Sequence, residues 1–164
     1  MNKLAIVLIS TVAVVAGGNI ALANSPKSAQ EFLTNAMKGD NSEIKLGQLA
    51  ADKGQSAGTK TFGQTLVTDH TKAKQQVADL DRSMGISPTD EMMPKAQAEY
   101  TKLQAMSGAA FDKEFASYMV DDHKSDISDF EAQTKATDQT AKLAQKQLPK
   151  LRKHLKMAQS LNGG

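Results

Sequence analysis

The sequence predicts an all-α protein whose core is a four-helix bundle. Apolar residues recur at intervals of three and four along four long segments, which is the spacing that places them on one face of a helix. Glycine, proline and serine residues separate these segments, and none of the stretches between them alternates as a strand does. Four amphipathic helices bury their apolar faces most simply against one another, so we expect a bundle.

The first two helices are expected at residues 26–54 and 59–84. Proline fits the first helical position, so Pro26 should begin the first helix, and Gly54 should end it. The second helix should stop at Gly85. Its predicted apolar face consists of Phe62, Leu66, Ala73, Val77, Leu80 and Met84.

A long connection follows the second helix. Residues 85–94 contain turn residues and two prolines, so we expect a loop there. Residues 95–106 should then form a short helix before Ser107 and Gly108.

The last two long helices are expected at residues 108–136 and 139–161. Ser107 is the predicted cap of the third helix and Asp138 the predicted cap of the fourth. Pro149 removes a backbone donor inside the fourth helix and should kink it.

The N-terminus has the layout of a cleaved signal peptide of the bacterial type. Lys3 precedes an uncharged apolar stretch, and an A-x-A pattern ends at Ala23. That stretch is shorter than the roughly 20 residues that span a bilayer. We therefore expect cleavage of residues 1–23, export to the periplasm with outer-membrane association left open, and one mature domain at residues 24–164.

Composition excludes several classes of function. Without Lys3 the chain has 19 basic and 18 acidic residues, interspersed rather than clustered, and it has no Trp, so nucleic acid is not an expected partner. No later segment is long and apolar enough for a membrane helix, so the mature form is not expected to span a bilayer. The absence of cysteine excludes disulfides, thiolate ligands and cysteine nucleophiles.

The three histidines of the chain fall on three different predicted helices. His70, His123 and His154 each lie within the apolar arc of their helix, and Glu43 lies on the inner face of the first helix. At about 1.5 Å of rise per residue, all four lie roughly 20 to 25 Å from the turns that join the helices. We therefore expect one layer in the middle of the bundle to hold all four side chains.

Three imidazoles and a carboxylate at one level suit a single transition metal ion such as Zn, Cu, Fe or Mn, because neutral histidine nitrogen binds all of these. The candidate metal ligands are Glu43, His70, His123 and His154, and the acids expected close enough to orient or supplement them are Asp40, Asp122 and Asp126. An alternative is a buried His/Glu polar network with no ion, since Glu43 needs a partner in either case.

Two aspartates directly precede histidines. Asp69 and Asp122 each lie about 100° around the helix from His70 and His123. This offset favours an orientation of both acids toward solvent or a neighbouring helix rather than toward the same ion.

Four segments of the mature chain resemble the exported bacterial family known as domain of unknown function 4142. The segments are EFLTNAMKGDNSEIKLGQLAADKG, FGQTLVTDHTKAKQQVADL, FDKEFASYMVDDHKSDISDFE and LPKLRKHLKMAQSL. The resemblance implies a ferritin-like fold, a periplasmic or outer-membrane location, and a recurring histidine in each of the last three helices, here His70, His123 and His154.

The chain departs from the di-iron pattern of ferritin-like proteins, in which a glutamate stands three residues before each histidine ligand. Val67 and Val120 occupy these positions before His70 and His123. The departure argues against di-iron oxidase or iron-storage chemistry and favours a mononuclear site.

Three functions remain open at this point. The first is a periplasmic metal-binding bundle for metal buffering or stress protection. The second is a non-metal interaction or structural module whose polar layer only specifies packing. The third is an enzyme in which a histidine-bound metal keeps a position open for water or a peroxide-like ligand. No substrate pocket or separate general base is evident in the sequence, which favours a non-enzymatic role.

Overall fold

The computed structural model describes residues 25–163, which contain five α-helices and no strand. The expected all-α bundle with a short additional helix is therefore confirmed. The predicted signal peptide, residues 1–23, lies outside the described residues. None of the helices within residues 25–163 combines the length and apolar character needed to cross a membrane. The helices are α1 (Ala29–Lys53), α2 (Ala57–Ser83), α3 (Pro94–Gln104), α4 (Gly108–Gln133) and α5 (Gln139–Asn162).

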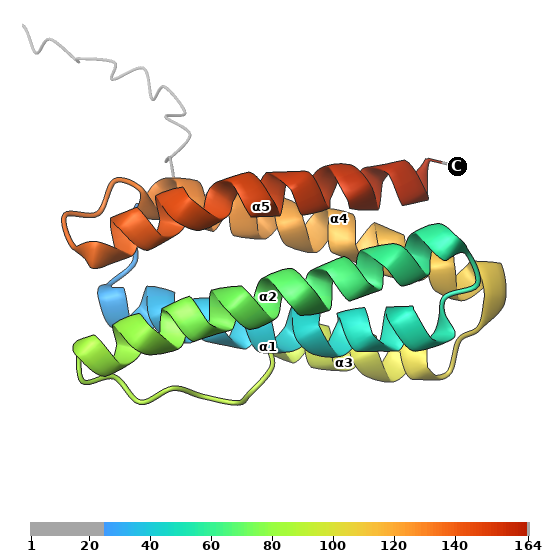
Figure 1. Cartoon of the computed structure of the whole chain (residues 1–164), viewed down its shortest axis with the longest axis horizontal. Coiled ribbons are helices and arrows are strands. Elements are labelled where there is room, and N and C mark those ends of the chain that lie inside the picture. The colour runs from blue at the N-terminus through green and yellow to red at the C-terminus, as the bar shows by residue number, and fades with distance from the viewer. Residues whose placement is uncertain (1–24, 164) are drawn as a thin grey trace, which may run out of the picture.

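Two helical hairpins form the bundle (Figure 1). Helix α1 packs along α2, and α4 packs along α5, each pair joined by a short connection at residues 54–56 or 134–138. The two hairpins meet chiefly where α2 faces α5. Helix α3 lies along α1 and also contacts α4, so the long connection between the hairpins packs against the bundle.

Local capping residues determine where several helices begin. Ser28 caps α1 by accepting a hydrogen bond from the backbone N–H of Glu31, so the helix begins at Ala29 and the expected start at Pro26 is wrong. Asp138 accepts from the backbone N–H of Thr140, which confirms its predicted role at the start of α5.

Helix α4 begins at the expected residue but lacks the expected capping hydrogen bond. Ser107 is the N-cap residue as predicted and adopts an extended conformation, but its side chain makes no capping hydrogen bond. Gly108, the first helical residue, has a φ of +64°, a conformation that glycine adopts without steric cost. Helix α5, by contrast, is continuous across Pro149, and His154 beyond it keeps its inward orientation.

Two apolar clusters fill the bundle on either side of a polar layer. One cluster lies toward the α1–α2 turn and includes Leu46, Phe62 and Phe115. The other lies toward the opposite end and includes Leu33 and Phe130. The polar side chains between the clusters are therefore surrounded by packed apolar residues and have to satisfy one another.

Candidate metal centre

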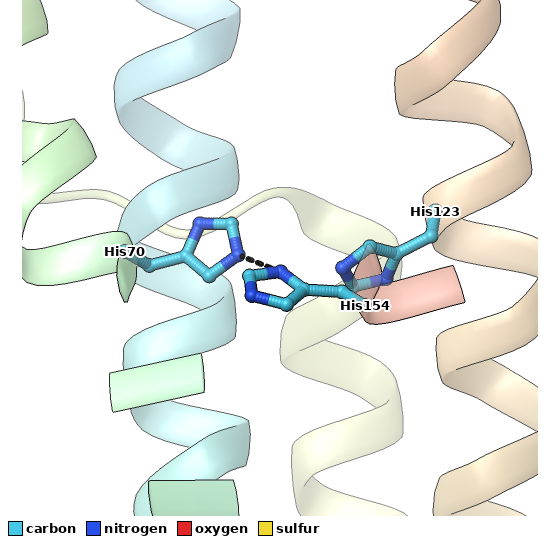
Figure 2. A group of neighbouring side chains, drawn as sticks. All are labelled: His70, His123 and His154. Atoms are coloured by element: carbon cyan, nitrogen blue, oxygen red, sulfur yellow. Dashed lines mark hydrogen bonds between the residues drawn. The ribbon is translucent and has the colours of Figure 1, made fainter. Parts of the chain in front are cut away.

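Each of the four long helices contributes one candidate ligand to the polar layer. Glu43 comes from α1, His70 from α2, His123 from α4 and His154 from α5. Their relative exposures are 2%, 4%, 0% and 0%, so all four are buried as expected. Figure 2 shows the three imidazoles directed toward one another from their separate helices.

A hydrogen-bond acceptor orients the first imidazole. Nδ1 of His70 lies 2.8 Å from Oδ1 of Asp40 and 2.8 Å from Oε2 of Glu43. Because both carboxylates are acceptors, Nδ1 carries the proton. The other ring nitrogen, Nε2, points toward the remaining histidines.

The other two imidazoles are oriented in the same way. Nδ1 of His123 donates to the backbone carbonyl of Met119 across 3.0 Å. Nε2 of His154 donates to Oδ2 of Asp69 across 3.0 Å. Histidines that bind metals commonly donate their second ring N–H to a carboxylate or a backbone carbonyl, which fixes the tautomer and the ring orientation.

The three nitrogens left over converge with one oxygen of Glu43. Nε2 of His70 lies 3.3 Å from Nδ1 of His154, and Nε2 of His123 lies 3.1 Å from Oε1 of Glu43. Nε2 of His123 and Oε1 of Glu43 are both buried and have no hydrogen-bond partner among residues 25–163. The distance between them is short enough for a hydrogen bond, but the geometry of their approach is not that of one. Each of the three imidazoles offers a nitrogen within 4.8 Å of those of the other two.

These distances have a direct chemical meaning. Two lone pairs that face each other repel unless a proton or a cation lies between them. A tetrahedral ion with metal–nitrogen bonds of about 2.0–2.1 Å holds adjacent ligand atoms about 3.3 Å apart. The separations of 3.3 Å and 3.1 Å therefore fit the edges of a coordination polyhedron.

Glu43 lies at the border of the histidine cluster rather than at its centre. It forms one group of potential ligands with His70 and Asp40, and another with His123 and Asp122. The prediction that the same ion binds all three histidines and Glu43 is untested by this grouping and remains a prediction.

The charge state without an ion follows from the surroundings. Burial lowers the pKa of His70, but the charge of Glu43 and hydrogen bonding to Asp40 and Glu43 outweigh it and raise that pKa well above its ordinary value. Burial raises the pKa of Glu43, but the charges of His70 and His123 outweigh it and lower that pKa to about 2. His70 is therefore an imidazolium, whose Nε2–H donates to His154.

The other two histidines are neutral near pH 7. Burial lowers the pKa of His123, and burial together with the charge of His70 lowers the pKa of His154 to about 4. Neutral imidazoles are the form that binds metal ions.

Further acids line a cavity of about 160 Å³ beside the histidine cluster, between α1 and α4. Burial raises the pKa of Asp40 to about 6 despite its hydrogen bond to His70. Burial and the charge of Glu43 raise the pKa of Asp122 to about 7. Asp122 offers a ligand atom within 4.8 Å of those of Glu43 and His123, so it lies beside the centre, close enough to supplement the ligands as expected, although its offset from His123 had favoured another orientation. Asp69, the other aspartate that directly precedes a histidine, faces the neighbouring α5 as expected.

Some contacts of the layer had not been predicted. The carbonyl of Met119 and the carboxylate of Asp69 orient two of the imidazoles, and Lys150 forms an ion pair with Asp69 from the solvent side. Gln147 also borders the layer, with its side-chain Nε2 buried and without a partner among the described residues. Helical periodicity marks inward positions, but it carries no information on which backbone carbonyl or flanking acid a histidine meets.

The fold and the layer together define a class of protein: an all-helical bundle with buried histidines and carboxylates at its centre. Residues 17–161 match the family described as Domain of unknown function (DUF4142), so the chain belongs to that family, as the sequence segments indicated.

A solved structure shares the fold. It is described as the crystal structure of a DUF305 fragment from Deinococcus radiodurans, and it aligns with a TM-score of 0.74 over 85% of this chain and 99% of that chain. The two sequences are 12% identical, so the likeness concerns the fold alone. A comparison with curated proteins found no match.

Proposed function

We propose that this protein binds one transition metal ion in the bundle core through His70, His123, His154 and Glu43. The protein would act in the periplasm, after removal of residues 1–23, in metal buffering or protection against metal stress. One observation carries the proposal: all three histidines have their second nitrogen engaged by an acceptor, while the remaining nitrogens converge on one point.

The donor set limits which ions fit. Three imidazole nitrogens and one carboxylate oxygen suit borderline ions such as Zn²⁺, Cu²⁺, Fe²⁺ and Mn²⁺. Met37 and Met119, whose thioethers would favour copper(I), belong to the apolar clusters instead. A site with buried ligands and no established substrate suits storage or buffering of the ion better than turnover.

Elemental analysis of the protein purified without an affinity tag tests the proposal. We expect at least one bound transition-metal ion per chain, and a rise in melting temperature when Zn²⁺ is added to the metal-free protein. Single His123→Gln and His154→Gln variants should abolish this rise.

A matched control separates lost ligands from lost packing. The ring of Phe62 lies 6.4 Å from that of His123 and 6.3 Å from that of His154 but offers no ligand atom. Phe62→Leu should lower the melting temperature of the metal-free protein and still respond to Zn²⁺. Absence of bound metal in the wild-type protein, with no response to Zn, Cu, Fe or Mn, would refute the proposal.

A second candidate function has one observation in its favour. The Nδ1 atom of His70 lies 2.8 Å from both Asp40 and Glu43, so a protonated His70 satisfies part of the layer without any ion. In that case the layer specifies packing in an interaction module. The same elemental analysis and the same melting curves decide between the two candidates.

A further inference from the structure

The cavity between α1 and α4 opens a path from the surface to the buried histidine layer. Its volume is about 160 Å³, and His70 and Glu43 form part of its inner wall. Among the charged side chains of that wall, carboxylates outnumber the two lysines, Lys27 and Lys95. The carboxylates are Asp40 and Glu43 from α1 and Asp122, Asp126 and Asp129 from α4.

Positive charge in this cavity does not match the negative charge. Lys27 is paired with Asp129, with a separation of 2.5 Å between Nζ and Oδ2. Lys95 directs its ammonium group over the ring of Tyr118, 5.5 Å from the ring centre. Asp122 is hydrogen-bonded to Tyr118 and lies within the influence of the Lys95 charge, but neither Asp122 nor Asp126 forms an ion pair with a lysine of residues 25–163.

Two buried oxygen atoms in this wall lack any hydrogen-bond partner among the described residues. They are Oδ2 of Asp40 and Oε1 of Glu43, in side chains that are 5% and 2% exposed. A buried carboxylate oxygen without a donor costs free energy, and a bound cation removes that cost. Oε1 of Glu43 faces His123 in the histidine site, so Oδ2 of Asp40 is the one of these two atoms that the histidine site leaves unused.

Glu43 stands between the histidine cluster and these acids. Its Oε1 lies 3.1 Å from His123 and its Oε2 lies 2.8 Å from His70. It also forms one potential ligand group with Asp40 and His70 and another with Asp122 and His123, with ligand atoms within 4.8 Å of one another in each group. One carboxylate can thus serve ions on both of its sides.

We infer that this cavity holds a second divalent cation, bound by the carboxylates of Asp40, Asp122 and Asp126, with Glu43 shared between it and the histidine site. The inference deepens the proposed function, because it makes the centre dinuclear. The ligands are all oxygen atoms, which suit hard ions such as Mn²⁺ or Mg²⁺ that retain water ligands, and the cavity has room for such waters. The two sites therefore differ in the ions they prefer.

Sequential loading with two metals tests the inference. The metal-free full chain receives one equivalent of Zn²⁺ and is then titrated with Mn²⁺, with free Mn²⁺ measured by electron paramagnetic resonance. We expect one further equivalent of Mn²⁺ to bind to the wild-type protein. The double variant Asp122→Asn, Asp126→Asn should retain Zn²⁺ and bind Mn²⁺ at least tenfold more weakly.

A charge-matched control lies on the same helix. Asp121 and Glu131 are exposed, so the double variant Asp121→Asn, Glu131→Gln removes two charges without touching the cavity and should bind Mn²⁺ as the wild type does. Retained Zn²⁺ binding also shows that the double variant is folded.

The outcomes separate the two ideas. Zn²⁺ binding without a second equivalent, or unchanged Mn²⁺ binding by the double variant, overturns the inference and leaves the proposed function intact. Conversely, His154→Gln should lose Zn²⁺ and keep Mn²⁺. A wild-type protein that binds Mn²⁺ and no Zn²⁺ would overturn the histidine site alone.

Discussion

The carboxylate of Asp69 on α2 connects the buried His154 on α5 with the solvent-facing Lys150. Its Oδ2 accepts a hydrogen bond from Nε2 of His154 across 3.0 Å, and its other oxygen pairs with the lysine ammonium group. The contact holds His154 in the tautomer whose Nδ1 faces His70. Asp69 therefore acts on the centre by orienting a ligand.

Replacement of Asp69 by Asn should weaken Zn²⁺ binding by about 10- to 100-fold, because partners that orient a histidine ligand typically contribute this much. A competition titration against a chromophoric chelator measures the change. Lys150→Gln removes the outer partner alone and should change the affinity far less. Equal effects of the two variants would show that surface charge, rather than ligand orientation, explains the loss.

Metal affinity should fall as the pH falls through neutrality. The pKa of His70 is raised well above its ordinary value, so without metal this residue is protonated near pH 7, and an ion at Nε2 has to displace that proton. We expect the apparent Zn²⁺ affinity to rise about tenfold per pH unit between about pH 6 and pH 8. Calorimetry in two buffers of different ionisation enthalpy should detect about one proton released per ion. An affinity independent of pH would contradict the assigned charge of His70.

In the metal-free protein, Asp122→Asn should stabilise the fold more at about pH 8 than at about pH 5. The pKa of Asp122 is raised from 3.8 to about 7 on folding, so the folded state disfavours the ionised form, and this cost grows as the pH rises to about 7. Asparagine removes the charge. Melting curves with excess chelator should show a gain of several degrees at the higher pH. An equal gain at both pH values would show that the effect does not arise from ionisation of Asp122.

A close approach of α1 and α2 at two glycines gives a prediction about stability. A Cβ atom on Gly63 would lie 2.5 Å from the carbonyl oxygen of Gly47 and 2.7 Å from the backbone nitrogen of Ala51. Because both neighbours are backbone atoms, Gly63→Ala should lower the free energy of unfolding by about 1–3 kcal/mol. Urea denaturation of the metal-free protein measures this.

Gly39 on α1 is a matched control for that substitution. A Cβ atom there meets nothing within 4 Å, and the residue lies inside a helix. Gly39→Ala should therefore raise the free energy of unfolding by about 0.5–1 kcal/mol. If both variants lose stability, the effect of Gly63→Ala does not arise from the close contact between α1 and α2.

The helical periodicity of apolar residues in the sequence was enough to predict the bundle and the burial of its polar layer. An inward residue repeats at helical intervals, so the burial of Glu43, His70, His123 and His154 could be predicted from their positions relative to apolar neighbours. Their common level followed from the rise of a helix and from the positions of the turns.

Other features depended on contacts that no local pattern encodes. Ser28 caps α1 because its hydroxyl accepts a hydrogen bond from the N–H of Glu31, although Ser25 stands just before Pro26, where the helix was expected to begin. Two sequence-based expectations for Asp122 conflicted, closeness to the ligands and an offset of about 100° from His123, and only the packing of α4 against the other helices places it beside Glu43 and His123. The tertiary packing between helices determines these contacts.

The division of the bundle into two hairpins has a consequence for how the molecule assembles. Glu43 and His70 belong to the α1–α2 hairpin, whereas His123 and His154 belong to the α4–α5 hairpin. Neither half alone contains the full set of candidate ligands, so the layer is complete only where the two halves meet. An ion bound as proposed would connect the halves, in a chain that has no cysteine to provide a covalent link.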